Sequence, residues 1–290
     1  MIDLHTHTKY SDGTWEVKKL LEEAEKNQVD ILAITDHDTV KAHIELKTYD
    51  YSKYFTGKII AGAEFNCIFN NAKIELLGYN FDVNKMDKWI NNIYNFEKKQ
   101  PNLQEEFNLL MKACYKNHIK VDKIVYKENM GWPIDFVYES IKKYSENKKY
   151  FSEKEWNDID YFFRCCTCNT DFPLYIDLSY QVPNAKLVSD EIRRLGGKVF
   201  LAHLFTYPLR DYEKYLDSLV KDNIIDGIET YYSKFTDEQT NFIIDYCQKN
   251  NLYMSAGTDC HGDKKPDRKV GIGYGNMNVQ IDIVSTWIDY

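Results

Sequence analysis

Residues 1–38 read MIDLHTHTKYSDGTWEVKKLLEEAEKNQVDILAITDHD. Residues 1–4 fit a short strand, and residues 30–34 are almost continuously apolar, as in a strand buried on both faces. Between them a helix that begins at Thr14 gathers its apolar side chains on one face, namely Val17, Leu20, Leu21 and Ala24. This stretch therefore predicts a strand–helix–strand unit, which is the building block of a parallel α/β sheet.

The same alternation continues on both sides of a long central stretch. Helices are predicted over residues 185–195, 211–221 and 237–250, the first ending before Gly196-Gly197. With the two above, the predicted strands number seven, the others being residues 58–63, 73–79, 198–202, 226–230 and 252–256. Seven strands alternating with helices favour parallel βα units arranged as one barrel.

Strand signals almost vanish between residues 85 and 184, where Lys, Asn, Phe and Tyr dominate. We interpret this stretch as a helical insertion within one barrel-like domain. The predicted organisation is a first barrel part over residues 1–84, the insertion over 85–184, and a second barrel part over 185–290.

Composition limits the class of protein. Of the 290 residues, 43% are hydrophobic and 28% are charged, which is typical of a globular domain with a buried core. The formal charge of −8 argues against stable binding of duplex nucleic acid, although a short phosphate-bearing substrate stays possible. The start of the chain lacks a signal peptide pattern and no apolar run could span a bilayer, so we expect a cytoplasmic protein without membrane contact.

Seven cysteines form an irregular set. A reduced population is the expectation for a protein without an export signal. The cluster Cys165-Cys166-Thr167-Cys168 could bind a soft metal, but it lacks a second spaced pair; structural or incidental thiols are the alternative.

Polar residues follow several predicted strands. In His5-Thr6-His7 the two imidazoles project to the same side of an extended chain and could reach one ion, and Asp12 follows shortly after. The alternative is a pair of surface histidines. In Thr35-Asp36-His37-Asp38, the two aspartates could be ligands or could cap a helix and order His37.

Three further motifs place polar residues at the ends of predicted strands. Glu64 ends the strand that contains Gly62-Ala63, and His203 ends the strand that contains Leu201-Ala202. In Gly257-Thr258-Asp259-Cys260-His261-Gly262, residues 259 and 261 face one side and Cys260 faces away. Five of the seven histidines thus lie at predicted strand ends, while His43 and His118 are expected to pack or to lie on the surface.

The motifs LHTHTKYSDGT, LAITDHDT, GAEF, LLGYNFD, LAH and GTDCHG occur in this order along the chain. Their order and spacing resemble the PHP (polymerase and histidinol phosphatase) family of metal-dependent phosphoesterases. Within it, the chain most resembles the stand-alone bacterial enzymes that act on nucleoside 3′,5′-bisphosphates and on the 5′ ends of short RNA. The resemblance implies an α/β fold, a distorted (β/α)7 PHP barrel with a helical insertion.

The resemblance also implies a site for two or three divalent ions of Mn, Zn or Fe. One ion would be bound by His5, His7, Glu64 and Asp259, and a second by Asp12, His37 and His261. A third would share Glu64 and take His203 and Glu75, at a position that is usually His in the family. Because Glu adds negative charge and a harder donor, a site with only two ions stays open. All these residues except Glu75 are also the implied catalytic residues.

The implied reaction is hydrolysis of a phosphate monoester by metal-activated hydroxide, on small nucleotides such as 3′,5′-bisphosphates or on short RNA or DNA. The alternatives are a histidinol-phosphate phosphatase and a non-catalytic metal-binding PHP module. Cations beyond the metal motifs could bind a second phosphate or could be solvated surface charges, namely Arg210, Arg268, Lys264 and Lys265. Tyrosines such as Tyr207 and Tyr232 could stack on a base, with packing as the alternative.

Overall fold

The computed structural model describes residues 1–70, 72–93, 103–127, 130–169, 171–178, 180 and 182–288. Its first unit has the predicted order, with β1 (Ile2–Asp3), α1 (Val17–Lys26) and β2 (Ile31–Ala33). The two strands pair in parallel, and the predicted apolar face of α1 is buried in one cluster with Leu32 and Ile34. After the short helix α2 (Lys41–Leu46), β3 (Lys58–Ile60) adds a third parallel strand beside β2.

A second sheet has five strands in the order β4-β5-β6-β7-β8. They are β4 (Gly62–Phe69), β5 (Ala72–Tyr79), β6 (Lys198–Leu201), β7 (Gly227–Tyr232) and β8 (Tyr253–Gly257). The last three strands are parallel and alternate with α8 (Ala185–Arg194), α9 (Tyr212–Lys221) and α10 (Asp237–Asn250), as the sequence predicted.

The prediction of seven strands, all in parallel units, is wrong between residues 58 and 79. The strand expected over residues 58–63 divides into β3 and β4, which belong to different sheets. β4 and β5 form an antiparallel hairpin, and β5 is also antiparallel to β6. The reason is the connection, because two residues separate β4 from β5 and a parallel crossover needs about a dozen or more.

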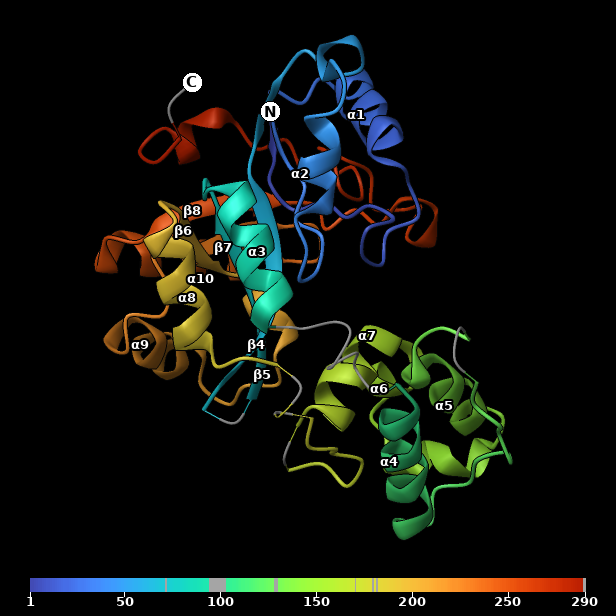
Figure 1. The fold of residues 1–290 in the computed structure, drawn as a ribbon. Coiled ribbons are helices and arrows are strands. Elements are labelled where there is room, and N and C mark those ends of the chain that lie inside the picture. The colour runs from blue at the N-terminus through green and yellow to red at the C-terminus, as the bar shows by residue number, and fades with distance from the viewer. Residues whose placement is uncertain are drawn as a thin grey trace.

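Backbone hydrogen bonds join the two sheets at both ends. The Leu4 N–H donates to the Ala256 carbonyl at 2.8 Å, and the Glu64 N–H donates to the Thr35 carbonyl at 3.2 Å. Strands of both sheets enclose one buried apolar cluster, which includes Leu4, Ala33, Leu77, Phe200 and Ala256. The sheets therefore curve around a common interior, with helices outside (Figure 1).

Residues 103–178 form what we call the helical region, and the rest of the described chain is called the sheet region. The helical region contains α4 (Leu103–Lys116), α5 (Pro133–Lys142), α6 (Glu153–Asn157), α7 (Ile159–Phe162) and a short π-helix (Phe163–Thr167). These helices lie to one side of the sheets in Figure 1 and have their own apolar cluster, with Phe107, Leu110, Val137 and Phe162.

Helix α3 (Val83–Ile93) differs from the helices that follow it. Its buried residues Met86 and Ile90 belong to the same cluster as Phe65 of β4 and Ile192 of α8. The predicted boundary at residues 84 and 85 therefore cuts through a helix that packs on the sheets. Across the described parts of the chain, no helix is both long enough and apolar enough to cross a membrane.

Candidate metal centre

The ends of five strands place the predicted ligands together. β1 leads into His5 and His7, β2 into His37, and β6 into His203, while β4 carries Glu64 near its start and β8 leads into the segment with Asp259 and His261. Most of these side chains are almost fully buried, and His37 is the most exposed, at 26% of its side-chain surface. Motifs that are far apart in the sequence thus form one compact cluster of imidazoles and carboxylates.

A first set of ligand atoms surrounds His5 and His7. The His5 Nε2 atom lies 3.1 Å from both His7 Nε2 and Glu64 Oε2. His7 Nε2 is 3.3 Å from Glu64 Oε2 and 3.3 Å from Asp259 Oδ1. Ligand atoms about 2.1 Å from a tetrahedral or octahedral ion lie roughly 3.0–3.4 Å from one another. These spacings therefore suit a single divalent ion.

Glu229 of β7 fixes the orientation of His5. Its Oε1 accepts a hydrogen bond from His5 Nδ1 at 2.8 Å, and its Oε2 accepts the His203 N–H at 2.7 Å. With Nδ1 donating to this carboxylate, Nε2 is the His5 atom that would bind an ion. Sequence reasoning missed Glu229, although a fully buried Glu in the middle of the strand Gly227–Tyr232 was a signal for it.

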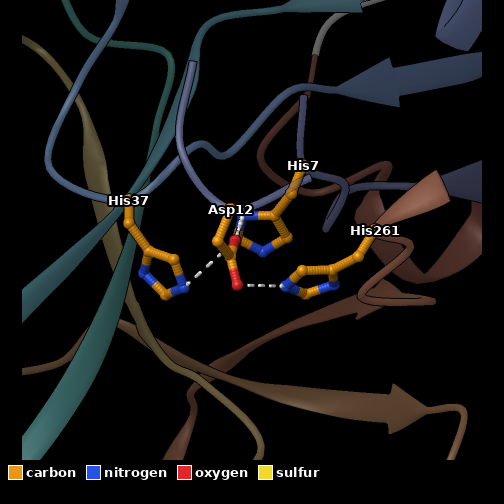
Figure 2. Close-up of side chains that lie close together, drawn as sticks. All are labelled: His7, Asp12, His37 and His261. Atoms are coloured by element: carbon orange, nitrogen blue, oxygen red, sulfur yellow. Dashed lines mark ion pairs between the residues drawn. The ribbon is translucent and has the colours of Figure 1, made fainter. Parts of the chain in front are cut away.

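A second set of ligand atoms surrounds Asp12, which Figure 2 shows between the rings of His37 and His261. Asp12 Oδ2 is 3.0 Å from His261 Nε2, and Asp12 Oδ1 is 3.7 Å from His7 Nδ1 and 3.9 Å from His37 Nε2. Asp12 Oδ1 and His37 Nδ1 are buried and make no hydrogen bond with any described residue. A bound cation would satisfy such an oxygen, so this set also fits a divalent ion.

A third set lies around Glu75 on β5. His203 Nε2 is 2.9 Å from Glu64 Oε1 and 3.3 Å from Glu75 Oε2. The same Glu75 oxygen is 2.6 Å from Nη2 of Arg164, a residue of the helical region. Burial alone would raise the pKa of Glu75, but the Arg164 guanidinium, together with His203 and His37, holds this pKa below its usual range. In this set the paired cation is Arg164, on the same Glu75 oxygen that lies nearest His203.

The charges of the cluster depend on one another. Burial would lower the pKa of His7, but hydrogen bonds with Asp259 and Glu64 outweigh it and raise this pKa to about 9. Burial would raise the pKa of Glu64, but His5 and His37 hold it well below its ordinary value. Without a metal, protons on imidazoles balance the carboxylates, and a divalent ion would replace them.

Three further aspartates hold the loops that carry the ligands. Asp36 accepts the Thr8 N–H and the Ser11 hydroxyl, both at 2.7 Å, and so orders the loop of Asp12. Asp38 accepts the Asn66 N–H at 2.9 Å, which joins its loop to β4. The alternative to a ligand role that the sequence offered was helix capping or ordering of His37, whereas these contacts order the loop of Asp12 and the start of β4. Asp3, which sequence reasoning missed, accepts the Thr258 N–H at 3.0 Å.

A cavity of about 810 Å³ opens onto the cluster, and both regions line it. The sheet region contributes Lys264, Lys265 and Arg268, and the helical region contributes Trp132, Asp160 and Arg164. Asp160 forms ion pairs with Lys234 at 3.0 Å and with Arg268 at 3.5 Å. The cavity wall thus includes side chains of opposite charge, some from the sheet region and some from the helical region.

The two arginines predicted to bind substrate differ in position. Arg268 is only 3% exposed and its Nη1 donates to Asp259 Oδ2, so it also positions a candidate ligand. Arg210 is 91% exposed, is paired with Asp171, and is absent from the described residues that line the cavity. The geometry supports a role in the site for Arg268 but not for Arg210.

Other predicted residues have packing or positioning contacts. Tyr207 accepts the Glu75 N–H at 3.0 Å, and the Tyr232 hydroxyl donates to Asp259 Oδ2 at 3.0 Å. His43 is buried and hydrogen-bonded to the Ile34 carbonyl. All seven cysteines are free, and Cys260 is fully buried beside the cluster without joining any of its ligand sets.

Comparison with known proteins gives matches over short stretches of the chain. Over 81 residues the chain is 35% identical to the 5'-3' exoribonuclease Rnm of Escherichia coli, which covers 28% of each protein. Over 80 residues it is 32% identical to the 5'-3' exoribonuclease of Haemophilus influenzae, again 28% of each. The chain thus matches well under a third of the length of these relatives.

Two solved structures share the fold over nearly the whole chain. A proposed metal-dependent phosphoesterase of Bifidobacterium adolescentis has a TM-score of 0.65 and 20% identity, covering 98% of this chain and 94% of its own. An amidohydrolase of Chromobacterium violaceum, solved with sulfate and without metal, has a TM-score of 0.63 and 18% identity, covering 93% and 89%. The PHP domain family matches residues 3–169, more than half of the chain. This protein therefore belongs to the PHP domain family.

Proposed function

We propose that this protein is a metal-dependent hydrolase of phosphate monoesters, acting on small nucleotides such as 3′,5′-bisphosphates or on short oligonucleotides. The observation that carries this proposal is the pair of buried ligand sets around His5 and Asp12, which share His7 and adjoin a cavity that Lys264, Lys265 and Arg268 help to line. We also interpret the two joined sheets as a distorted (β/α)7 barrel, whose strand ends are the usual place for an active site.

The donor atoms indicate which metals to expect. Imidazole nitrogens mixed with carboxylate oxygens suit Mn, Fe or Zn rather than a soft, thiolate-bound metal. His5, His7, Glu64 and Asp259 would hold one ion, and Asp12, His37 and His261 a second. When bound, such ions lower the pKa of a coordinated water and neutralise phosphoryl oxygens.

The protein's own residues would orient and neutralise the reacting groups. Glu229 keeps His5 in the tautomer that offers Nε2, and Asp36 holds the loop of Asp12 in place. Lys264 lies 3.2 Å from Asp12, and Lys265 lies 3.9 Å from Asp160, so both are near the position of an incoming phosphate. These cations favour a dianionic monoester over a neutral substrate.

The nucleotide part of the proposal rests on the cavity and on the named relatives. A volume of about 810 Å³ is within the usual range for small-molecule sites and can hold a nucleotide. Trp132 and Tyr274 line it and keep 46% and 43% of their surface exposed, so either ring could stack on a base. The two matched relatives are exoribonucleases by name, which agrees with a nucleic-acid phosphate as substrate.

The test is phosphate release by the purified chain with Mn2+. The substrates are a nucleoside 3′,5′-bisphosphate, a short 5′-phosphorylated RNA, histidinol phosphate and an aryl phosphate. We expect the nucleotide substrates to be turned over fastest, and Asp12→Asn to abolish release. Faster turnover of histidinol phosphate would favour the histidinol-phosphate phosphatase. Release from none of them by metal-loaded protein would refute the proposal and leave a non-catalytic metal-binding module.

A further inference from the structure

Arg164 connects the helical region to the metal cluster. It lies on the π-helix Phe163–Thr167, and its side chain is only 17% exposed. Its Nη2 atom is 2.6 Å from Glu75 Oε2, and its guanidinium lies 5.3 Å from the centre of the Tyr207 ring. Tyr207 in turn accepts the Glu75 N–H at 3.0 Å. These contacts join the side chains of Arg164, Glu75 and Tyr207 into one unit at the edge of the cavity.

This unit occupies the place of a third ion. The Glu75 oxygen that faces His203, Oε2, is the one paired with Arg164. A divalent cation about 2.1 Å from this oxygen would stand close to a permanently charged guanidinium in a buried site. Repulsion between the two positive charges disfavours an ion on this oxygen while the Glu75–Arg164 pair is formed.

The geometry also leaves Arg164 able to touch a ligand. It is among the residues that line the cavity, as are Glu64 and His203. A guanidinium has five N–H donors in a planar fork that matches two oxygens of a phosphate, and the pair with Glu75 is made through Nη2. A phosphoryl group held over the first two ligand sets can therefore receive donors from Arg164 as well.

We propose that Arg164 takes the position of a third metal ion, so that the site works with two divalent ions and one guanidinium that binds a phosphoryl oxygen. This inference rests on the proposed phosphoesterase function and names a residue that the helical region contributes to it. The helical region would then supply part of the phosphate-binding site as well as part of the cavity wall.

The first measurement counts metal. The purified full chain is equilibrated with excess Mn2+, freed of unbound ion and analysed by atomic emission. We expect two ions per chain in the wild type and three in Arg164→Met, because removal of the guanidinium frees the Glu75 oxygen. The matched control is Arg194→Met, which removes an exposed arginine paired with Glu191 at 2.6 Å and should leave the count at two.

The second measurement is binding of inorganic phosphate, by calorimetry, to protein that carries two equivalents of Mn2+. Loss of a charged hydrogen bond should weaken binding about ten- to a hundredfold in Arg164→Met, and less in Arg164→Lys, which keeps the charge but not the fork. Arg194→Met should bind phosphate like the wild type.

Two results would overturn the assignment. One is a wild type that binds three ions per chain; the other is an Arg164→Met chain that matches the wild type in both ion count and phosphate affinity. If Arg164→Met does not fold, Arg164→Lys decides, and unchanged phosphate affinity in that variant would refute the role. Neither measurement needs turnover, so a chain that hydrolyses no ester yet shows this dependence on Arg164 would refute the phosphoesterase proposal alone.

Discussion

The sheet region and the helical region contribute to the same cavity in different ways. In the sheet region the charged groups converge at strand ends, are buried, and are held by further carboxylates such as Glu229 and Asp36. The helical region lies to one side of the sheets and has a separate apolar cluster (Figure 1). Its Asp160 pairs with Lys234 and its Arg164 with Glu75. We infer that the sheet region provides the candidate metal ligands and that the helical region affects which ligand binds in the cavity.

The largest expected effect comes from a ligand shared by two ion sets. His7→Ala should remove ligand atoms from both sets, which corresponds to several kcal/mol of transition-state stabilisation and about a thousandfold loss of phosphatase activity. Metal content should fall with it. The control is His118→Asn, an exposed histidine at the end of α4 whose positive φ suits Asn. Full activity and metal content in His7→Ala would contradict the metal centre.

A comparison of two core leucines tests how separate the regions are. Leu110→Ala in the helical region and Leu216→Ala in the sheet region each remove a fully packed side chain, and each should lower the free energy of unfolding by about 2–5 kcal/mol. Only Leu216→Ala should reduce the metal content measured at temperatures just below its melting transition. Equal metal loss in both variants would mean that the two regions unfold as one unit.

Glu229→Gln should have a smaller effect within the sheet region. The amide keeps the shape of the side chain but is a weaker acceptor for His5 Nδ1, and loss of such support weakens metal affinity about 10- to 100-fold. Competition with a chelator measures this change. Glu213→Gln, an exposed glutamate paired with Lys249, is the control. Unchanged metal affinity in Glu229→Gln would show that His5 binds metal without an orienting carboxylate.

The smallest expected effect concerns Glu106, which is 6% exposed in the helical region. Burial raises the pKa of this carboxyl, with Lys73 opposing the shift. The folded state therefore holds this proton more tightly than the unfolded state, and stability falls as the pH rises from the ordinary pKa of Glu through the raised one.

Glu106→Gln should accordingly stabilise the protein at pH 7 and have little effect at pH 4, as measured by urea unfolding. Metal content should not change, because the residue is outside all three ligand sets. Glu139→Gln, on the exposed face of α5, should show much less dependence on pH. A destabilised Glu106→Gln at neutral pH would mean that Lys73 outweighs burial.

The strand-end ligands could be predicted from sequence because each follows an apolar run directly. His5 and His203 needed only the rule that parallel strands end at one edge of a sheet. Glu64 was expected at the end of the strand over residues 58–63 but lies near the start of β4. The antiparallel hairpin also had a signal in the sequence, since only two residues, both of a type favoured in tight turns, separate two strand-forming runs. It was missed because the surrounding pattern favoured parallel units.

Arg164 could not be found in this way. It lies 89 residues from Glu75 along the chain, and only the folding of a separate helical cluster brings its guanidinium to β5. A lone arginine in a helical sequence usually lies on the surface, so neither periodicity nor spacing distinguishes it. Arg210 shows the converse error, because its position just after the LAH motif suggested a role that its exposure does not support.

The hydrogen bonds between the first strand and the last have a consequence for biosynthesis. Thr258 donates to Asp3 across 255 residues of sequence, and the Leu4 N–H pairs with Ala256. On the ribosome, His5 and His7 emerge well before Asp259 and His261 and cannot meet them until β8 and the segment after it have been made. We expect a nascent chain that stops before β8 to hold no complete ligand set around Asp12, so that metal loading follows translation.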